Sequence, residues 1–278
     1  GRRLDPNVLT LDYARYSLDG GKTFSQPEPV IGIHARLRDK GYCGRLLLKF
    51  EINAREIPAT CSLAVEQPFM YRSVTVNGTR VFFTEEYYCD DSFKTSSIDE
   101  LVDRGRNEIC LSLDYVAPKP NDLDPVKRYG TEIESIYLTG DFGVRARASE
   151  HPLKTSQKNS LKVLEPKPVL SYSGFELDAE TQTFDGNLTD AGYPFYAGSF
   201  ELENEFIVDT VENQRRYFLS FPSFEATVIR VEINGSPLPP LVFNPFEADI
   251  TELLHEGVNS VKVTLTNSLR NMLGPHHH

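Results

Sequence analysis

Four carboxylates lie within one short acidic stretch of the chain, residues 84–93, "TEEYYCDDSF". Two carboxylates about 5–9.5 Å apart across a sugar-sized cleft can cleave a glycosidic bond, and Asp-rich loops supply the oxygen ligands that calcium takes. Acidic residues in a hairpin loop also form ordinary solvated surface, and no motif pairs these acids with a catalytic partner. We therefore expect no catalytic residue and no metal ligand, with a structural calcium ion as the alternative. The four acids are Glu85, Glu86, Asp90 and Asp91.

Aromatic and amide side chains mix in two other stretches, "GYPFYAG" (192–198) and "VFNPFE" (242–247). Sugar recognition uses aromatic faces against the apolar side of the ring, and amide or charged groups against the hydroxyls. Core packing competes for the aromatic residues, because a β-sandwich needs them too, and structural capping competes for the polar ones. The candidate carbohydrate-binding residues are Tyr193, Phe195, Tyr196, Asn244, Phe246, Arg270 and Asn271.

Charge and motif content argue against several other classes of function. The 278 residues carry a formal net charge of −11 and contain no run of Lys or Arg. Because phosphate binding needs a basic stripe, we expect no nucleic-acid partner and no anionic membrane surface. No apolar run approaches the roughly 18 residues of a membrane-spanning helix. The motifs of hydrolase elbows, zincins, P-loops and dinucleotide sites are absent too.

One stretch of the chain occurs twice, at residues 97–115 and 249–267. Each copy predicts a polar cap, a short helical turn, a glycine that ends the turn, and a strand with one buried face. The matched pairs include Ile98 and Ile250, Leu101 and Leu253, Gly105 and Gly257, and Asn107 and Asn259. The alternation predicts that Leu111, Leu113, Val261, Val263 and Leu265 are buried, facing Leu48, Phe50, Leu219 and Phe221.

The correspondence continues upstream of both copies. "SVTVNGTRV" (73–81) matches "RVEINGSPL" (230–238), and each runs into Asn-Gly, a strong hairpin signal. We also match residues 45–52 with 216–224, and expect strands at 32–39 and 199–206. Four coincidences in one order indicate a duplication.

The pattern predicts an all-β chain with few short helical turns. Regularly spaced strands with turn signals are typical of β-sandwiches, so we expect two tandem jelly rolls, at residues 1–130 and 131–278. The Pro-rich stretch 117–132 is the expected linker. Residues 133–146 return to strand character, and either open the second sandwich or pair back onto the first.

The second copy resembles a known family. Its order of strand, Asn-Gly, Pro-Phe-x-x-Asp-Ile-Thr loop (245–251) and Gly-x-Asn strand looks like the sugar-binding, galactose-binding-like jelly-roll domain of glycoside hydrolase family 2. Residues 7–21, 137–144, 192–206 and 268–277 resemble β-sandwich regions of large bacterial glycosidases similar to family 106 α-L-rhamnosidases. The first copy departs from the pattern, because "DDSFKTSSID" lacks the Pro-Phe.

This resemblance implies a role beside a catalytic barrel that is not found in these residues. The chain opens with "GRRLDPN" and no Met, so we expect a piece of a larger bacterial protein, and the final "GPHHH" is native sequence or a tag remnant. The main hypothesis is a non-catalytic accessory piece of a glycoside hydrolase, whose partners are carbohydrate and the catalytic domain of the same polypeptide. An autonomous, lectin-like carbohydrate-binding module is the alternative, and a catalytic domain in its own right is a third. The sequence does not separate a cytoplasmic from a periplasmic or secreted location.

Overall fold

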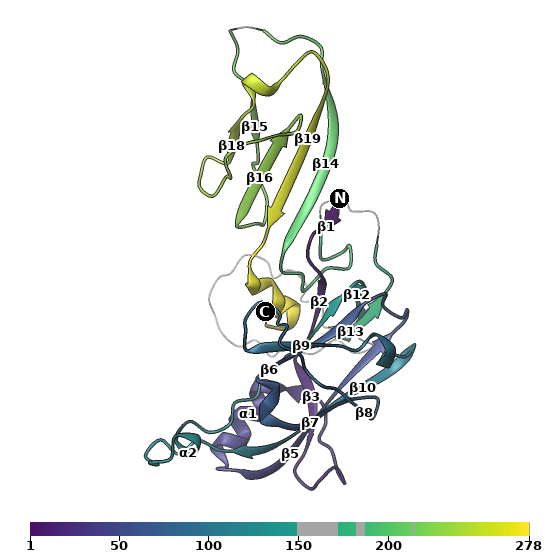
Figure 1. Cartoon of the computed structure of the whole chain (residues 1–278), viewed down its shortest axis with the longest axis vertical. Helices are drawn as coiled ribbons and strands as arrows, with labels where there is room; N and C mark the ends of the chain where they lie inside the picture. Colours follow the sequence, from purple (N-terminus) through teal and green to yellow (C-terminus); the bar gives the residue numbers. More distant parts are fainter. Residues whose placement is uncertain (149–171, 182–186, 213, 278) are drawn as a thin grey trace, which may run out of the picture. The chain divides into compact units, whose positions relative to one another are not determined.

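The computed structural model describes residues 1–148, 172–181, 187–212 and 214–277, which form two compact units built mainly from strands (Figure 1). The larger unit comprises Leu11–Glu180, and the smaller unit comprises Gly1–Thr10 with Thr181–His278. This division differs from the single boundary near residue 130 that we expected. Within the described residues, no helix is both long enough and apolar enough to cross a membrane.

The larger unit contains two sheets and one helix of three turns. One sheet has the strand order β12-β13-β5-β10-β7-β8, with β3 paired to β5 and β4 paired to β3. The other contains β11, β6 and β9, in that order, and β2 (Asn7–Leu11) is its fourth strand. All pairs are antiparallel except that of β13 with β5. The elements are β3 (Tyr13–Ser17), β4 (Glu28–Pro29), α1 (Val30–Asp39), β5 (Cys43–Ala54), β6 (Cys61–Glu66), η1 (Pro68–Met70), β7 (Tyr71–Val76), β8 (Thr79–Arg80), β9 (Phe93–Ser97), η2 (Asp99–Leu101), β10 (Gly105–Val116), α2 (Pro125–Tyr129), β11 (Ile136–Gly140), β12 (Gly143–Ala148) and β13 (Tyr172–Asp178).

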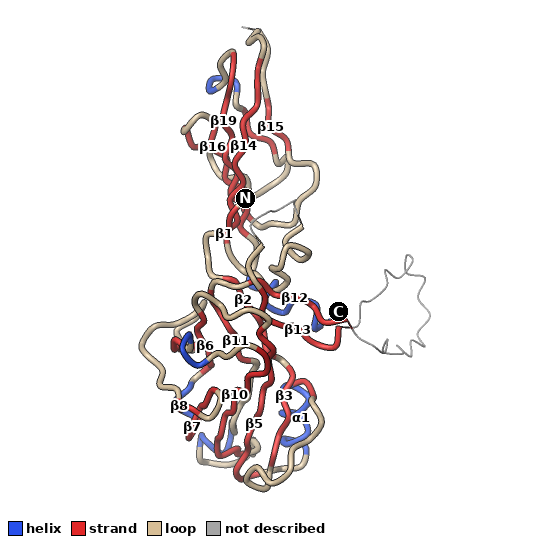
Figure 2. Tube along the Cα trace, turned by 90° about the vertical axis from the view of Figure 1, so that its right-hand side faces the viewer, coloured by secondary structure: helices blue, strands red, loops and turns tan. Residues whose placement is uncertain are grey.

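The smaller unit repeats this plan with fewer strands. Its main sheet has the order β1-β14-β19-β16-β17, and β15 and β18 form a second, two-stranded sheet. Strands predominate in both units (Figure 2). The elements are β1 (Arg2–Arg3), β2 (Asn7–Leu11, whose last residue lies in the larger unit), β14 (Ser199–Val208), β15 (Phe218–Ser220), β16 (Val228–Ile233), β17 (Ser236–Pro237), β18 (Glu247–Asp249), η3 (Thr251–Leu253), β19 (Gly257–Thr266) and η4 (Leu269–His277).

The strand pairing follows the duplicated sequence. The order β5-β10-β7-β8 in the larger unit corresponds to β14-β19-β16-β17 in the smaller, and β6 pairs with β9 as β15 pairs with β18. The registers agree, because Leu111 lies opposite Leu48 and Val74, and its counterpart Val263 lies opposite Leu202 and Val231. The assignment of both units as jelly rolls stays a prediction.

Two of the sequence matches were wrong. Residues 45–52 belong to β5, whose counterpart is β14 rather than 216–224, and residues 216–224 contain β15, the counterpart of β6. Residues 32–39 are not a strand but part of α1, a helix of 10 residues. Val30, Ile33 and Leu37 are its buried residues, and their spacing places them on one helical face. The segment "GIHARLRD" has only eight residues, and its apolar positions fit the strand period of two as well as the helix period of 3.6 residues.

The Pro-rich stretch 117–132 lies within the larger unit. It contains α2 and leads into β11, which pairs with β6 through Tyr137–Ala64 and Leu138–Leu63. Of the two alternatives for residues 133–146, pairing back onto the first copy is therefore correct. The stretch connects two strands of one unit, so its Pro-rich composition marks a surface loop rather than a boundary.

The two copies of the repeat differ in how well they bury their central strand. On β10, Ile109, Leu111 and Leu113 are each 0% exposed, and Leu48 and Phe50 of β5 are equally buried, as we expected. On β19, Val261, Val263 and Leu265 are only half-buried, although they pack with Leu219 and Phe221 against one hydrophobic cluster. A two-stranded second sheet covers less area than the three strands β11, β6 and β9.

Candidate functional site

The conserved spacing of the repeat builds the same polar cluster in both units. Asn234 adopts φ +50° and donates from Nδ2 to the Leu253 carbonyl and to Asn259 Oδ1, both at 2.8 Å, while Ser260 N donates to Asn234 Oδ1 at 2.8 Å. In the larger unit Asn77, at φ +49°, makes the matching bonds, to the Leu101 carbonyl and Asn107 Oδ1 and from Glu108 N. The repeated asparagines are thus structural, since they satisfy the backbone where the helical turn enters the last strand.

The Asp-Ile-Thr motif at residues 249–251 is structural in the same way. Thr251 Oγ1 donates to Asp249 Oδ1 at 2.6 Å and accepts from Tyr217 N at 2.9 Å, which ties β15 to the start of η3. An ion pair with Arg216 also holds Asp249. Thr251 and Arg216 together lower the pKa of Asp249 to about 2.

The first copy keeps this carboxylate–hydroxyl pair with the two residue types exchanged. Ser97 occupies the place of Asp249, and Asp99 that of Thr251. Ser97 Oγ donates to Asp99 Oδ2 at 2.8 Å, and Asp99 Oδ1 accepts from the backbone N–H of Cys61, the counterpart of Tyr217. The first copy lacks the Pro-Phe, but the exchange of residue types at positions 97 and 99 preserves the carboxylate–hydroxyl hydrogen bond.

A pocket of 460 Å³ lies beside this motif in the smaller unit. One wall comes from the loop after β15 and the other from the Pro-Phe loop before β18. Asn244 is exposed at the pocket, and Phe246 is half-buried with its ring edge-on to Phe224, at 4.6 Å between centroids. The lining residues are Ser220, Phe221, Pro222, Ser223, Phe224, Asn244, Pro245, Phe246 and Glu247.

The structure does not bring the remaining sugar-binding candidates to this pocket. Tyr193, Phe195 and Tyr196 are 6%, 0% and 1% exposed, and Tyr193 packs edge-on against Tyr196 and Phe200. Their ring faces are covered by protein, which corresponds to the core-packing alternative. Arg270 and Asn271 are exposed on η4 and line neither described pocket.

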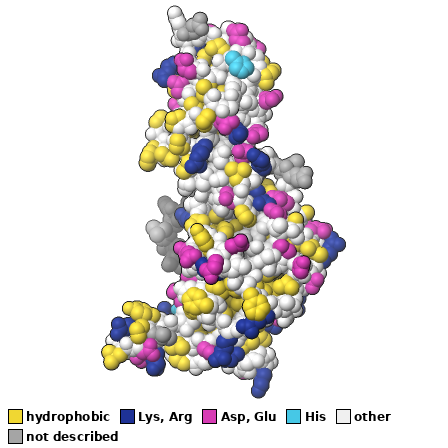
Figure 3. Space-filling view, in the orientation of Figure 1, with side chains coloured by type: hydrophobic (Ala, Val, Ile, Leu, Met, Phe, Trp, Pro, Cys, Tyr) yellow, Lys and Arg dark blue, Asp and Glu magenta, His cyan; other side chains and the backbone are white. Residues whose placement is uncertain are grey.

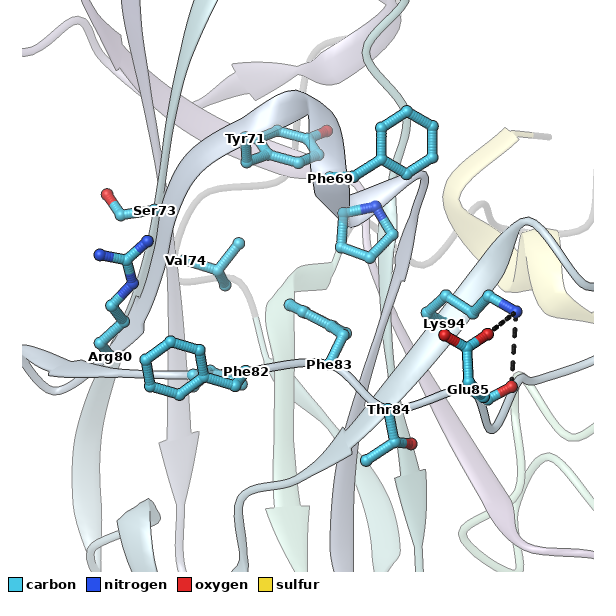
Figure 4. Close-up of a pocket in the computed structure, with 12 residues that line it drawn as sticks. Phe69, Tyr71, Ser73, Val74, Arg80, Phe82, Phe83, Thr84, Glu85 and Lys94 are labelled. Atoms are coloured by element: carbon cyan, nitrogen blue, oxygen red, sulfur yellow. Dashed lines mark hydrogen bonds and ion pairs between the residues drawn. The ribbon is translucent and has the colours of Figure 1, made fainter.

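A second pocket, of 320 Å³, lies in the larger unit (Figure 4). Its walls are η1, β7 and the segment after β8. We call it the Phe69–Phe82 groove, after the two exposed rings at its rim. The lining residues are Pro68, Phe69, Tyr71, Ser73, Val74, Arg80, Val81, Phe82, Phe83, Thr84, Glu85 and Lys94. Sequence reasoning missed this groove, because η1 and residues 80–84 carry no motif.

The acidic stretch 84–93 forms a structured turn at one end of the groove. Asp90 accepts from Ser92 N at 2.8 Å, and its hydrogen bonds with Ser92 lower the pKa of its carboxyl. Lys94 lies between Asp91, at 2.7 Å, and Glu85, at 3.4 Å. Among the described residues no group of three or more His, Cys, Asp or Glu side chains is arranged to hold a metal ion.

Two other acids have a raised pKa. Burial raises the pKa of Glu66 and of Glu134, and nearby carboxylates, Glu132 among them, raise both further. A raised pKa favours proton donation near neutral pH. Neither residue lines either pocket, so no sugar-sized space is described beside them.

No protein-family model and no curated protein matches the chain. Solved structures that it resembles include a β-D-glucuronidase from Dictyoglomus thermophilum (17% identity, 54% of this chain and 32% of that one, TM-score 0.32). Another is the Streptomyces avermitilis α-L-rhamnosidase complexed with L-rhamnose (12% identity, 94% of this chain and 24% of that one, TM-score 0.36). A third is a β-glucuronidase from Ruminococcus gnavus (10% identity, 96% of this chain and 40% of that one, TM-score 0.36). The chain thus spans well under half the length of these proteins.

Proposed function

We propose that this chain is a non-catalytic, carbohydrate-binding accessory part of a larger glycoside hydrolase, and that it binds sugar in the Asn244–Phe246 pocket of the smaller unit. The observation that carries the proposal is the position of the Pro-Phe loop. The loop whose sequence resembles the family 2 sugar-binding domain forms one wall of the 460 Å³ pocket.

The chemistry of the pocket supports a sugar ligand. The Asn244 amide offers both a donor and an acceptor, and the exposed Glu247 and Ser223 side chains add polar groups around the apolar surface of Phe221 and Phe224. A few polar groups over an aromatic floor are what a pyranose ring requires. Because the pocket is open, we expect dissociation constants on the order of millimolar, roughly −4 kcal/mol.

A glycan screen followed by titration tests the proposal. We expect the isolated chain to bind at least one glycan, and Asn244→Ala to weaken that binding at least severalfold. Asn121→Ala is the matched control, since Asn121 is an exposed asparagine of the larger unit that lines neither pocket. Equal binding by wild type and Asn244→Ala would remove this pocket as the site, and no binding to any glycan would overturn the proposal.

The alternative, an autonomous lectin-like module, predicts tighter binding that needs no further domain. The half-buried β19 face favours the accessory role, because a free-standing module gains by burying its central strand fully. Isolated-chain affinity in the micromolar range would favour the module instead.

A further inference from the structure

The Phe69–Phe82 groove has two large aromatic side chains exposed to solvent. Phe69 is 83% exposed and Phe82 is 73% exposed, while Tyr71 and Phe83 are half-buried between them. Exposed apolar patches rimmed by polar groups mark binding sites. On the face shown in Figure 3, hydrophobic side chains lie in small groups among acidic and basic ones. Exposure of these aromatic side chains to water is unfavourable, so a ligand that covers them gains free energy.

The two ends of the groove differ in charge. At one end Lys94 pairs with Glu85, as Figure 4 shows, and also with Asp91, so its ammonium group is already neutralised. At the other end the Arg80 guanidinium lies 5.4 Å from the centre of the Phe82 ring and donates one hydrogen bond, 3.0 Å long, to the Arg72 carbonyl. The described residues provide no carboxylate partner for Arg80.

An arginine in this position is preorganised for an anion. Its guanidinium has five donors in a planar fork, and a single carbonyl takes up one of them. The remaining donors match the two oxygens of a carboxylate. Stacking on Phe82 and the bond to Arg72 restrict the side chain, so less conformational entropy is lost on binding.

We propose that the Phe69–Phe82 groove binds an acidic sugar, a uronic acid residue of an oligosaccharide, with its carboxylate on Arg80 and its ring against the exposed phenylalanines. The Ser73 hydroxyl and the Glu85–Lys94 pair also line the groove and offer hydrogen-bond partners for the hydroxyls of the sugar. The volume of 320 Å³ lies at the lower end of small-ligand pockets, roughly 300–1,000 Å³. This inference rests on the proposed carbohydrate-binding function, but it places a second, acid-selective site in the other unit.

Titration of the full chain with a uronic acid oligosaccharide and with its neutral counterpart tests the proposal. The chain has no Trp, so calorimetry or saturation-transfer NMR is the readout. We expect Arg80→Gln to weaken the acidic ligand about tenfold or more, the equivalent of one charge-assisted hydrogen bond, and to leave the neutral one unchanged. Phe82→Ala should weaken the acidic ligand as well.

Two matched controls accompany these variants. Arg104→Gln removes an exposed arginine that pairs with Glu56, and Phe243→Ala removes an exposed phenylalanine, 82% exposed, that lines neither pocket. Both should bind as wild type does.

Three results would overturn the inference. One is acidic-ligand binding that survives both Arg80→Gln and Phe82→Ala; if Asn244→Ala abolishes it, the proposed function stands and the groove fails. The second is an equal loss of affinity for the acidic and the neutral oligosaccharide in Arg80→Gln, because Arg80 would then not select for the carboxylate. The third is retention of a Pro-rich peptide, through Phe69 and Phe82, with no uronate binding. Loss of all glycan binding in wild type would instead refute the proposed function itself.

Discussion

The asparagines repeated in both copies have a structural role, because their side chains bond to the backbone of the turn. Asn259 is fully buried, and its side chain donates to the carbonyls of His255 and Gly257 and accepts from His255 N and from Asn234. Asn107 makes the equivalent bonds in the larger unit. An asparagine thus stabilises the turn before the last strand of the repeat in each unit.

We predict that Asn259→Ala destabilises the smaller unit by about 2–4 kcal/mol, because several buried backbone groups lose their partners at once. Asn107→Ala should do the same in the larger unit. Urea unfolding followed by circular dichroism measures both, with Asn121→Ala as the control. A change below about 0.5 kcal/mol, the range of ordinary surface substitutions, would show that the cluster does not hold the turn.

Glu66 makes the stability of the larger unit depend on pH. Burial raises the pKa of its carboxyl, so the folded chain binds this proton more tightly than the unfolded chain does. The stability that comes from the protonated form is complete below the unfolded pKa and is lost as pH rises through the folded pKa.

Glu66→Gln should therefore raise the melting temperature at pH 7, and the gain should shrink toward pH 4, where wild-type Glu66 becomes protonated. Melting curves of both proteins between pH 4 and 8 give the comparison. A variant that melts below wild type at pH 7, or a difference independent of pH, would contradict this account.

The exchanged carboxylate–hydroxyl pair joins β18 to η3 in the smaller unit and β9 to η2 in the larger unit. Asp249→Ser and Thr251→Asp each break the pair in the smaller unit, and the two together recreate the Ser97–Asp99 arrangement of the larger unit. We expect the double variant to be more stable than the sum of the single changes predicts, by about 0.5–3 kcal/mol of coupling. Additive single effects in urea unfolding would show that the two copies are not equivalent here.

The sequence predicts the elements best where a strand alternates over its full length. Leu111 and Leu113 alternate with polar residues, and the paired strands place them in the core as expected. The prediction was wrong for α1, because eight residues around Ile33 and Leu37 fit a period of two as well as one of 3.6. The match of residues 45–52 with 216–224 was wrong as well, because both segments have strand character and this does not show which strands correspond.

The candidate site was predicted in part for a related reason. The Pro-Phe loop has a sequence signature, so Asn244 and Phe246 could be named, and both line a pocket. Tyr193 and Phe195 have the same residue types, but only tertiary packing decides which aromatic rings are covered. The Phe69–Phe82 groove gives no local signal, since three separate segments build it.

At the scale of the whole molecule, the proposal of an accessory role predicts a negative result. Glycoside hydrolysis requires a carboxylic acid of raised pKa opposite a second carboxylate across the scissile bond. Glu66 and Glu134 have raised pKa values but line neither pocket, and Asp90 beside the groove has a lowered one.

We therefore expect the isolated chain to show no turnover of aryl rhamnosides, galactosides or glucuronides in a chromogenic assay. Turnover that disappears on changing a single Asp or Glu of this chain, with Glu66→Gln and Glu134→Gln as the first variants, would replace the accessory role by a catalytic one.

A residue-resolved NMR titration of the full chain with the best glycan from the screen tests whether the two pockets bind carbohydrate. We expect amide shifts that saturate together and lie in the two loops of the smaller-unit pocket, residues 220–224 and 244–247. A uronic acid oligosaccharide should also shift residues 68–85 of the larger unit, and Asn244→Ala should remove the first set alone. Saturable shifts confined to other residues, or no shifts at millimolar glycan, would contradict the claim that this duplicated fold binds carbohydrate in its paired pockets.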